Sequence, residues 1–105
     1  MKVRWGRAAE RELSYAADYL EEQTVGLGIE FLDEVERVAS LVSEFPNLGM
    51  AVNEFRREVL LAKFPYRLVY DLTDAGIRII AVAHQKQRPR YWQWRVEEAR
   101  LLYVA

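Results

Sequence analysis

The hydrophobic period of this chain changes near its middle, and that change limits the folds open to it. Between residues 7 and 45 apolar side chains recur every three to four positions, the spacing of amphipathic α-helices. Between residues 66 and 84 they alternate with polar residues or form a β-branched run, which is typical of strands. The pattern predicts one α+β domain over residues 1–105, with a short basic and aromatic C-terminal segment from about residue 86.

Two helices are expected in the first half of the chain. The first spans about 7–22 and the second about 27–44, where Pro46 follows and ends the pattern. Residues 23–28 contain two glycines and break the periodicity, and Thr24 is a candidate N-cap. Two amphipathic helices joined by a short loop predict an antiparallel hairpin, which needs another apolar surface to pack against.

The sheet is expected to come mainly from the second half. Four segments have strand character, the first of them only as a short edge strand: 2–5, 55–63, 66–73 and 77–84. Residues 74–76, Asp-Ala-Gly, supply a turn between the last two. The predicted order is therefore β-α-α-β-β-β, a helical hairpin packed on one face of an antiparallel sheet. Residues 90–102 are predicted to be either a short terminal helix or a tail.

Composition excludes several kinds of chemistry. The chain has no cysteine, so it has no disulfide, thiol nucleophile or cysteine-rich metal site. His84 is the only histidine, which excludes His-rich metal clusters. The three serines all fall in helical patterns, so a Ser-His-Asp site is rejected. Gly26 and Gly28 form a lone GxG with no strand before it, which does not support dinucleotide binding. The remaining possibility is a function that needs neither a metal nor a cofactor.

Targeting signals are not expected either. The first thirteen residues contain no apolar stretch of the kind a secretory leader requires. The most apolar run, 79–83, is far too short to span a bilayer. We therefore expect a cytoplasmic protein without a membrane partner.

The formal net charge of −1 hides an asymmetry between the two halves of the chain. Residues 1–53 hold five basic and ten acidic residues, whereas residues 54–105 hold ten basic and six acidic ones. The positive charge is concentrated at 84–95, which reads HQKQRPRYWQWR and contains no acid. Because partners respond to charges within about 8–10 Å in physiological salt, this local field matters more than the total. Basic residues interleaved with aromatic ones indicate a surface for nucleic acid or for an acidic protein.

Several segments, taken in order, resemble the RelE/ParE superfamily of bacterial toxins from type II toxin–antitoxin systems. The matching segments are the helix at 8–20, FLDEV at 31–35, FPNLG at 45–49, FPYRLVY at 64–70, AVAH at 81–84, and RPRYW at 88–92 followed by Arg95. Together they cover roughly residues 1–95. The long helical hairpin and the ending after His84 look more ParE-like than RelE-like.

The resemblance implies a small toxin that is neutralised by a cognate antitoxin, with which it would form a hetero-oligomer. ParE-like members poison DNA gyrase, which would require no catalysis here. RelE-like members cleave mRNA on the translating ribosome, and inactive members that only bind their antitoxin form a third class. We expect the gyrase activity and keep the other two as alternatives.

The nuclease alternative assigns a role to particular residues. Arg67 matches the arginine that RelE-like nucleases use to hold the scissile phosphate, and His84 and Tyr91 would transfer protons or stack on a base. The residues expected to contact phosphate or the target are Lys63, Lys86, Arg88, Arg90 and Trp92. For each residue a structural role is the alternative: a surface charge, a hydrogen-bonded histidine, or aromatic packing over the sheet.

Two departures count against a nuclease. Where RelE-like enzymes carry a second catalytic arginine just after the last strand, this chain has Gln85. The chain as a whole is also not basic, which weakens the case for docking on a ribosome.

Overall fold

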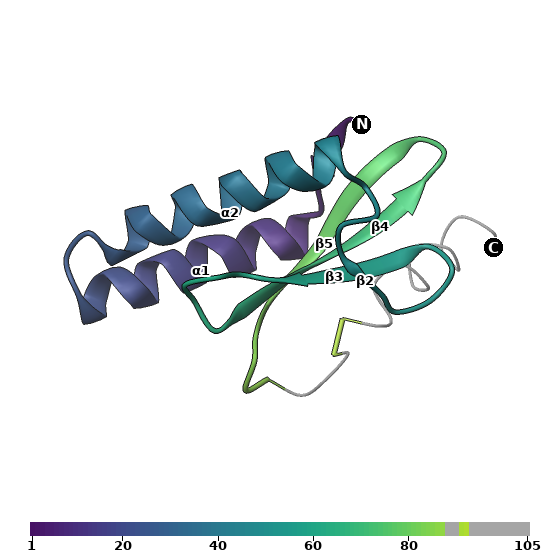
Figure 1. The fold of residues 1–105 in the computed structure, drawn as a ribbon. Coiled ribbons are helices and arrows are strands. Elements are labelled where there is room, and N and C mark those ends of the chain that lie inside the picture. The colour runs from purple at the N-terminus through teal and green to yellow at the C-terminus, as the bar shows by residue number, and fades with distance from the viewer. Residues whose placement is uncertain (88–90, 93–105) are drawn as a thin grey trace.

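The computed structural model describes residues 1–87 and 91–92, which form a helical hairpin packed on a five-stranded sheet (Figure 1). The elements in chain order are β1 (Val3–Trp5), α1 (Arg7–Gln23), α2 (Leu27–Glu44), β2 (Met50–Ala51), β3 (Arg56–Leu60), β4 (Tyr66–Thr73) and β5 (Gly76–His84). The predicted α+β class and helical hairpin are confirmed, and the short strand β2 is an addition. The helix or tail predicted for 90–102 lies, except for 91–92, outside the described residues.

The sheet has the strand order β1-β5-β4-β3-β2. The predicted antiparallel arrangement holds for all neighbours from β2 to β5, but β1 runs parallel to β5, so the sheet is mixed. The reason is the path of the chain. The helical hairpin carries it from β1 to the far edge, and three antiparallel steps return β5 beside β1 in the same direction.

Hydrogen-bond acceptors of α1 hold the loop between the two helices. Thr24 was expected to cap α2, but it is extended and its N–H donates to the carbonyl of Leu20, which ends α1. Gly26 occupies the N-cap position with a φ of 91°, a left-handed conformation that glycine adopts without strain. The carboxylate of Glu21 accepts the N–H groups of Gly26 and Gly28 at 2.8 and 2.9 Å. A side chain from the preceding helix thus satisfies the free amides that begin α2.

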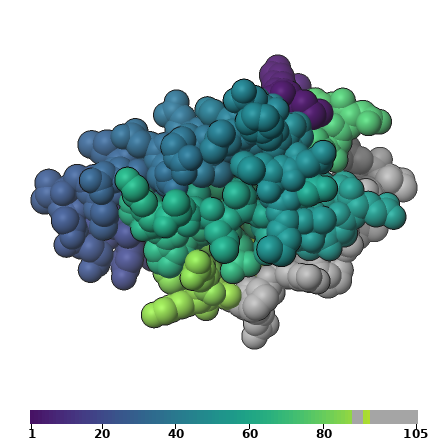
Figure 2. Space-filling model, in the orientation of Figure 1, coloured from purple at the N-terminus to yellow at the C-terminus, as the bar shows by residue number. Residues whose placement is uncertain are grey.

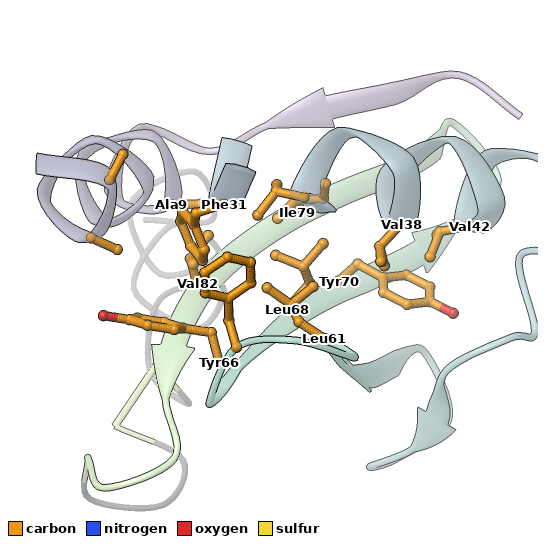
Figure 3. Packing of buried hydrophobic residues seen from close by; sticks show 14 of the residues in the cluster. Ala9, Phe31, Val38, Val42, Leu61, Tyr66, Leu68, Tyr70, Ile79 and Val82 are labelled. Atoms are coloured by element: carbon orange, nitrogen blue, oxygen red, sulfur yellow. The ribbon is translucent and has the colours of Figure 1, made fainter. Parts of the chain in front are cut away.

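The main core lies between the helices and one face of the sheet (Figure 3). Its largest fully buried side chains are Tyr70, Phe31, Leu68, Ile77, Ile79, Val35 and Val42. The alternation in β4 and β5 sends these strand residues toward the helices because successive strand side chains point to opposite faces. The period change along the sequence therefore corresponds to the two layers that share this core.

The face of the sheet away from the helices has a second, smaller core. It consists of Val69, Ile80, Ala81, Ala83 and Trp92, with Val52 and Tyr91 packed against it. In the space-filling view (Figure 2), the yellow-green atoms that follow β5 lie at the lower margin, on the side of the molecule opposite α2. Within the described residues, neither helix is long and apolar enough to cross a membrane.

Candidate functional site

Three of the expected site residues come together at one end of the sheet. The turn between β3 and β4 meets the segment after β5, where the N–H of Gln85 donates to the carbonyl of Pro65 at 2.9 Å. Lys63 lies in that turn, His84 ends β5, and Lys86 follows it. Both lysines are exposed, so this end of the sheet presents positive charge to solvent.

His84 is held by its own neighbours in the chain. Its ring packs edge-on against Tyr66, with centroids 4.9 Å apart at 85°. Its Nδ1 accepts the backbone N–H of Lys86 at 3.0 Å, so in the neutral ring the proton lies on Nε2. Its own backbone N–H donates to Oε1 of Gln87 at 2.7 Å. The imidazole therefore presents a donor, Nε2–H, rather than a free base nitrogen.

Arg67 is on the other face of the sheet. In the β4–β5 register Tyr66 lies opposite His84 and Arg67 lies opposite Ala83. Because side chains alternate, Tyr66 and His84 face the helices and Arg67 faces away. Its guanidinium donates to the Glu58 carboxylate on β3 at 3.0 Å. The expected phosphate-binding arginine and the expected proton-transfer histidine are thus separated by the sheet.

Tyr91 contacts α1, whereas Trp92 packs on the face of the sheet away from the helices. The Tyr91 hydroxyl donates to one oxygen of Glu12 on α1, and the other oxygen accepts the N–H of Val82 at 3.0 Å. Trp92 is only 3% exposed and packs on the sheet, so its indole is not presented to a partner in this structure. Arg88 and Arg90, expected to contact the target, lie outside the described residues.

A groove of about 700 Å³ opens between α1 and the end of β5. We call it the α1–β5 groove; its lining residues are Ala8, Arg11, Glu12, Tyr15, Ala16, Tyr19, Tyr66, Val82, His84, Lys86 and Gln87. Sequence reasoning found His84 and Lys86 but missed the wall that α1 contributes. Arg11, Tyr15 and Tyr19 are spaced four residues apart, so a polar and aromatic stripe on α1 was visible in the sequence.

Tyr66 is the one groove tyrosine whose pKa its surroundings clearly shift, among the described residues. Burial raises the pKa of Tyr66 above its ordinary value of 10.0, and the phenols of Tyr19 and Tyr15 raise it further. In Figure 3 the Tyr66 hydroxyl points away from the center of the core. At physiological pH the phenol is therefore neutral. Among residues 1–87 and 91–92 there is no cluster of three histidines or carboxylates able to hold a metal ion.

Comparison with known families identifies the chain's relatives. A family model described as the ParE toxin of the type II toxin–antitoxin system parDE matches residues 3–89. The chain belongs to this family. Membership confirms the resemblance seen in the sequence segments and implies an antitoxin as partner.

Solved structures of two toxins share the fold. A chain of the chromosomal ParDE system from P. aeruginosa is 17% identical, with a TM-score of 0.58, and the match covers 80% of this chain and 95% of that one. The isolated E. coli RelE toxin is also 17% identical, with a TM-score of 0.56 and coverage of 92% and 96%. A comparison with curated protein sequences gave no significant match. At this identity the two structures establish the fold alone.

Proposed function

We propose that this ParE-family chain is a toxin that inhibits DNA gyrase through protein contacts, without chemistry of its own, and that a cognate antitoxin neutralises it in a hetero-oligomer. The observation that carries the proposal is the separation of Arg67 from His84 by the sheet. Phosphoryl transfer needs fixed positive charge and a proton-transfer group that both reach the reacting atoms of the substrate. Here the arginine is paired with Glu58, and the Tyr91 hydroxyl is bound to Glu12.

The basic end of the sheet supplies the contact surface in this proposal. Lys63 lies in the turn between β3 and β4, and Lys86 lies in the segment after β5 that is hydrogen-bonded to this turn. Both lysines are exposed. Exposed cations of this kind steer a partner of opposite charge and raise the rate of encounter. An acidic protein surface is therefore the partner that this end favours.

The test compares two targets in parallel. Purified toxin is incubated with gyrase and plasmid DNA, and separately with translating ribosomes programmed with a defined mRNA. We expect linearised plasmid from stabilised cleavage complexes and an intact message. A message cut at the ribosomal A site with normal supercoiling would overturn the proposal, and so would a toxin inert in both assays that still binds its antitoxin.

A variant pair sharpens the comparison. Arg67→Gln and His84→Gln each remove a group that the nuclease alternative requires, and neither side chain belongs to the main core. We expect both variants to arrest growth like the unaltered toxin. Loss of growth arrest in both, with antitoxin binding intact, would contradict the gyrase proposal. The double charge reversal Lys63→Glu and Lys86→Glu, by contrast, is expected to weaken inhibition of gyrase.

The RelE-like alternative retains one specific point in its favour. The fold is shared with the RelE toxin over 92% of this chain, and three basic or titratable candidates gather at one sheet end. A nuclease built on this arrangement would have to use Lys63, Lys86 and His84 without Arg67. The ribosome arm of the assay tests that version directly.

A further inference from the structure

The α1–β5 groove has a hydrogen-bonding character that the proposed function does not use. One wall is the α1 stripe of Arg11, Tyr15 and Tyr19, and the opposite wall is His84 and the segment after it. Tyr15 and Tyr19 are 76% and 50% exposed, so their rings are available rather than packed in the core. The groove is also lined by small side chains, which are Ala8 and Ala16 of α1 and Val82 of β5.

The carboxylate, imidazole and amide acceptors of this groove each already accept a hydrogen bond. Both carboxylate oxygens of Glu12 accept hydrogen bonds, one from Val82 and one from Tyr91. Nδ1 of His84 accepts from Lys86, and Oε1 of Gln87 accepts from the His84 backbone. The groups that face an incoming ligand are therefore mainly donors.

The donors are numerous and two of them are charged. They are Nε2–H of His84, the amide NH₂ of Gln87, the guanidinium of Arg11, the ammonium of Lys86 and the phenol hydroxyls. Over the part of the chain that the structure describes, neither Arg11 nor Lys86 forms an ion pair. A ligand that matches this set brings acceptors and negative charge.

The aromatic walls and the size narrow the ligand class further. Tyrosine faces stack on flat aromatic rings, and each such stack in nucleic-acid complexes contributes measurably to binding. A concave volume of about 700 Å³ lies within the range of small-molecule sites, and an aromatic lining with a few convergent polar groups is typical of them. We propose that the α1–β5 groove binds a nucleoside phosphate, with the base against Tyr15 and Tyr19 and the phosphate at Arg11 and Lys86.

An acidic peptide is the competing occupant, and two features favour the smaller ligand. A stable protein interface buries about 800 Å² on each partner, whereas this groove is bounded by about three turns of one helix and a short segment. The wall of His84 and Tyr66 is also fixed by ring packing and backbone hydrogen bonds, as a preformed small-molecule site requires. The proposal shares Lys86 with the surface proposed to contact gyrase, but its test uses the isolated chain, so its failure is distinct from a failure of the gyrase proposal.

The test is a titration of the isolated ¹⁵N-labelled toxin with adenosine monophosphate, adenosine and inorganic phosphate, followed by amide shifts and calorimetry. We expect saturable shifts around Tyr15, His84 and Lys86 with the nucleotide, and weaker binding of adenosine and phosphate separately. Equal affinity for phosphate would reduce the groove to a simple anion site and overturn the proposal. Shifts that do not saturate with the nucleotide would overturn it as well. So would a poly-glutamate peptide that binds in the groove and that the nucleotide does not displace.

Matched variants separate stacking from charge. Tyr15→Ala is expected to weaken nucleotide binding at least about fivefold, the lower end of what a lost base stack costs, while Tyr15→Phe retains it. Arg11→Gln is expected to weaken nucleotide binding and to reduce its dependence on salt. Arg7 is an exposed arginine of α1 outside this groove, so Arg7→Gln is expected to change neither. Equal effects of Arg11→Gln and Arg7→Gln would show that only overall charge matters. Because Tyr15 and Arg11 are exposed, thermal unfolding should confirm that all four variants fold.

Discussion

The hydroxyl of Tyr70 joins the main core to the loop after α2. The side chain is fully buried, yet its oxygen donates to the carbonyl of Pro46 at 2.6 Å and accepts the N–H of Gly49 at 2.9 Å. Tyr70→Phe keeps the ring but leaves both backbone groups without this partner. We expect the free energy of unfolding to fall by about 1–3 kcal/mol, measured by urea denaturation.

The control for this prediction is Tyr15→Phe, which removes a hydroxyl from a mostly exposed ring. Its effect on the free energy of unfolding is expected to stay within about 0.5 kcal/mol. If the two variants were equally stable, the hydrogen bonds of Tyr70 would contribute nothing net to the fold.

Glu34 is a nearly buried carboxylate that is well supplied with donors. Arg37 donates to its two oxygens at 2.8 and 3.0 Å, and the N–H of Ala62 donates at 3.1 Å. The hydrogen bond from Arg37 lowers the pKa of Glu34 below its ordinary 4.5 and outweighs burial, which acts in the opposite direction. Since Arg37 itself is half exposed, solvent screens the pair and its stabilisation is modest.

This lowered pKa predicts a pH-dependent stability. A carboxyl whose pKa is lower in the folded state stabilises the fold above its unfolded pKa, and that contribution disappears as pH falls through the folded value. We expect Glu34→Gln to be less stable than the unaltered chain at neutral pH, with the difference shrinking below about pH 4.5. Urea midpoints at neutral and acid pH measure it, with Glu36→Gln on the exposed side of α2 as control. A difference that stays constant across this range would contradict the prediction.

At the scale of elements, α1 and α2 lie close together at Gly28. A Cβ built there would lie 2.7 Å from the carbonyl oxygen of Ala17 and 3.0 Å from Oε1 of Glu21. Gly28→Ala must therefore separate the helices or disturb the cap that Glu21 provides. We expect a loss of about 1–3 kcal/mol in the free energy of unfolding, typical of overpacking. Ser40→Ala, at an exposed position of the same helix, is the control and should change little; equal stability of both variants would show that the hairpin adjusts freely.

The elements predictable from the sequence were those with a local signal. The alternation in β4, the turn at Gly76 and the two amphipathic helices each have their own periodicity or turn residues, and each was predicted close to its observed bounds. The strand β2 is only two residues long and is defined by its pairing with Arg57 and Glu58. No local pattern in the sequence predicts that pairing. The parallel pairing of β1 with β5 joins residues more than seventy positions apart.

The same limit applies to the candidate site. The sequence placed Arg67 and His84 on neighbouring strands, but only the register decides which face each occupies, and β5 contains an irregularity opposite Val69 and Tyr70 that shifts it by one residue. The bonds that Glu12 makes to Val82 and Tyr91 join distant parts of the chain and have no sequence signature. The aromatic stripe of α1 did have one, because Tyr15 and Tyr19 occupy the polar side of an amphipathic helix.

For the whole molecule, the sheet is covered differently on its two faces. The helical hairpin covers one, whereas the largest side chain of the second core among the described residues is Trp92, on the other face. Beneath it lies a buried ion pair, in which Arg56 donates to Asp71 at 2.6 and 3.1 Å. The Arg56 guanidinium also lies 5.4 Å from the ring center of Phe55 and 5.5 Å from that of Trp92. Trp92 therefore shields both apolar surface and a desolvated pair from water.

This arrangement makes Trp92 a stability determinant of the whole domain. Trp92→Ala is expected to lower the free energy of unfolding by about 3–5 kcal/mol, a large part of the roughly 5–15 kcal/mol typical of domains. It should also expose Val69 and Ile80, so a dye that binds apolar surface should fluoresce more strongly with the variant. Trp92→Phe, which keeps an aromatic ring over Arg56, should retain more than half of the lost stability. An alanine variant as stable as the unaltered chain, and as poor at binding the dye, would mean that the sheet face is stable when open. Trp92 would then be available for the target contact that the sequence suggested.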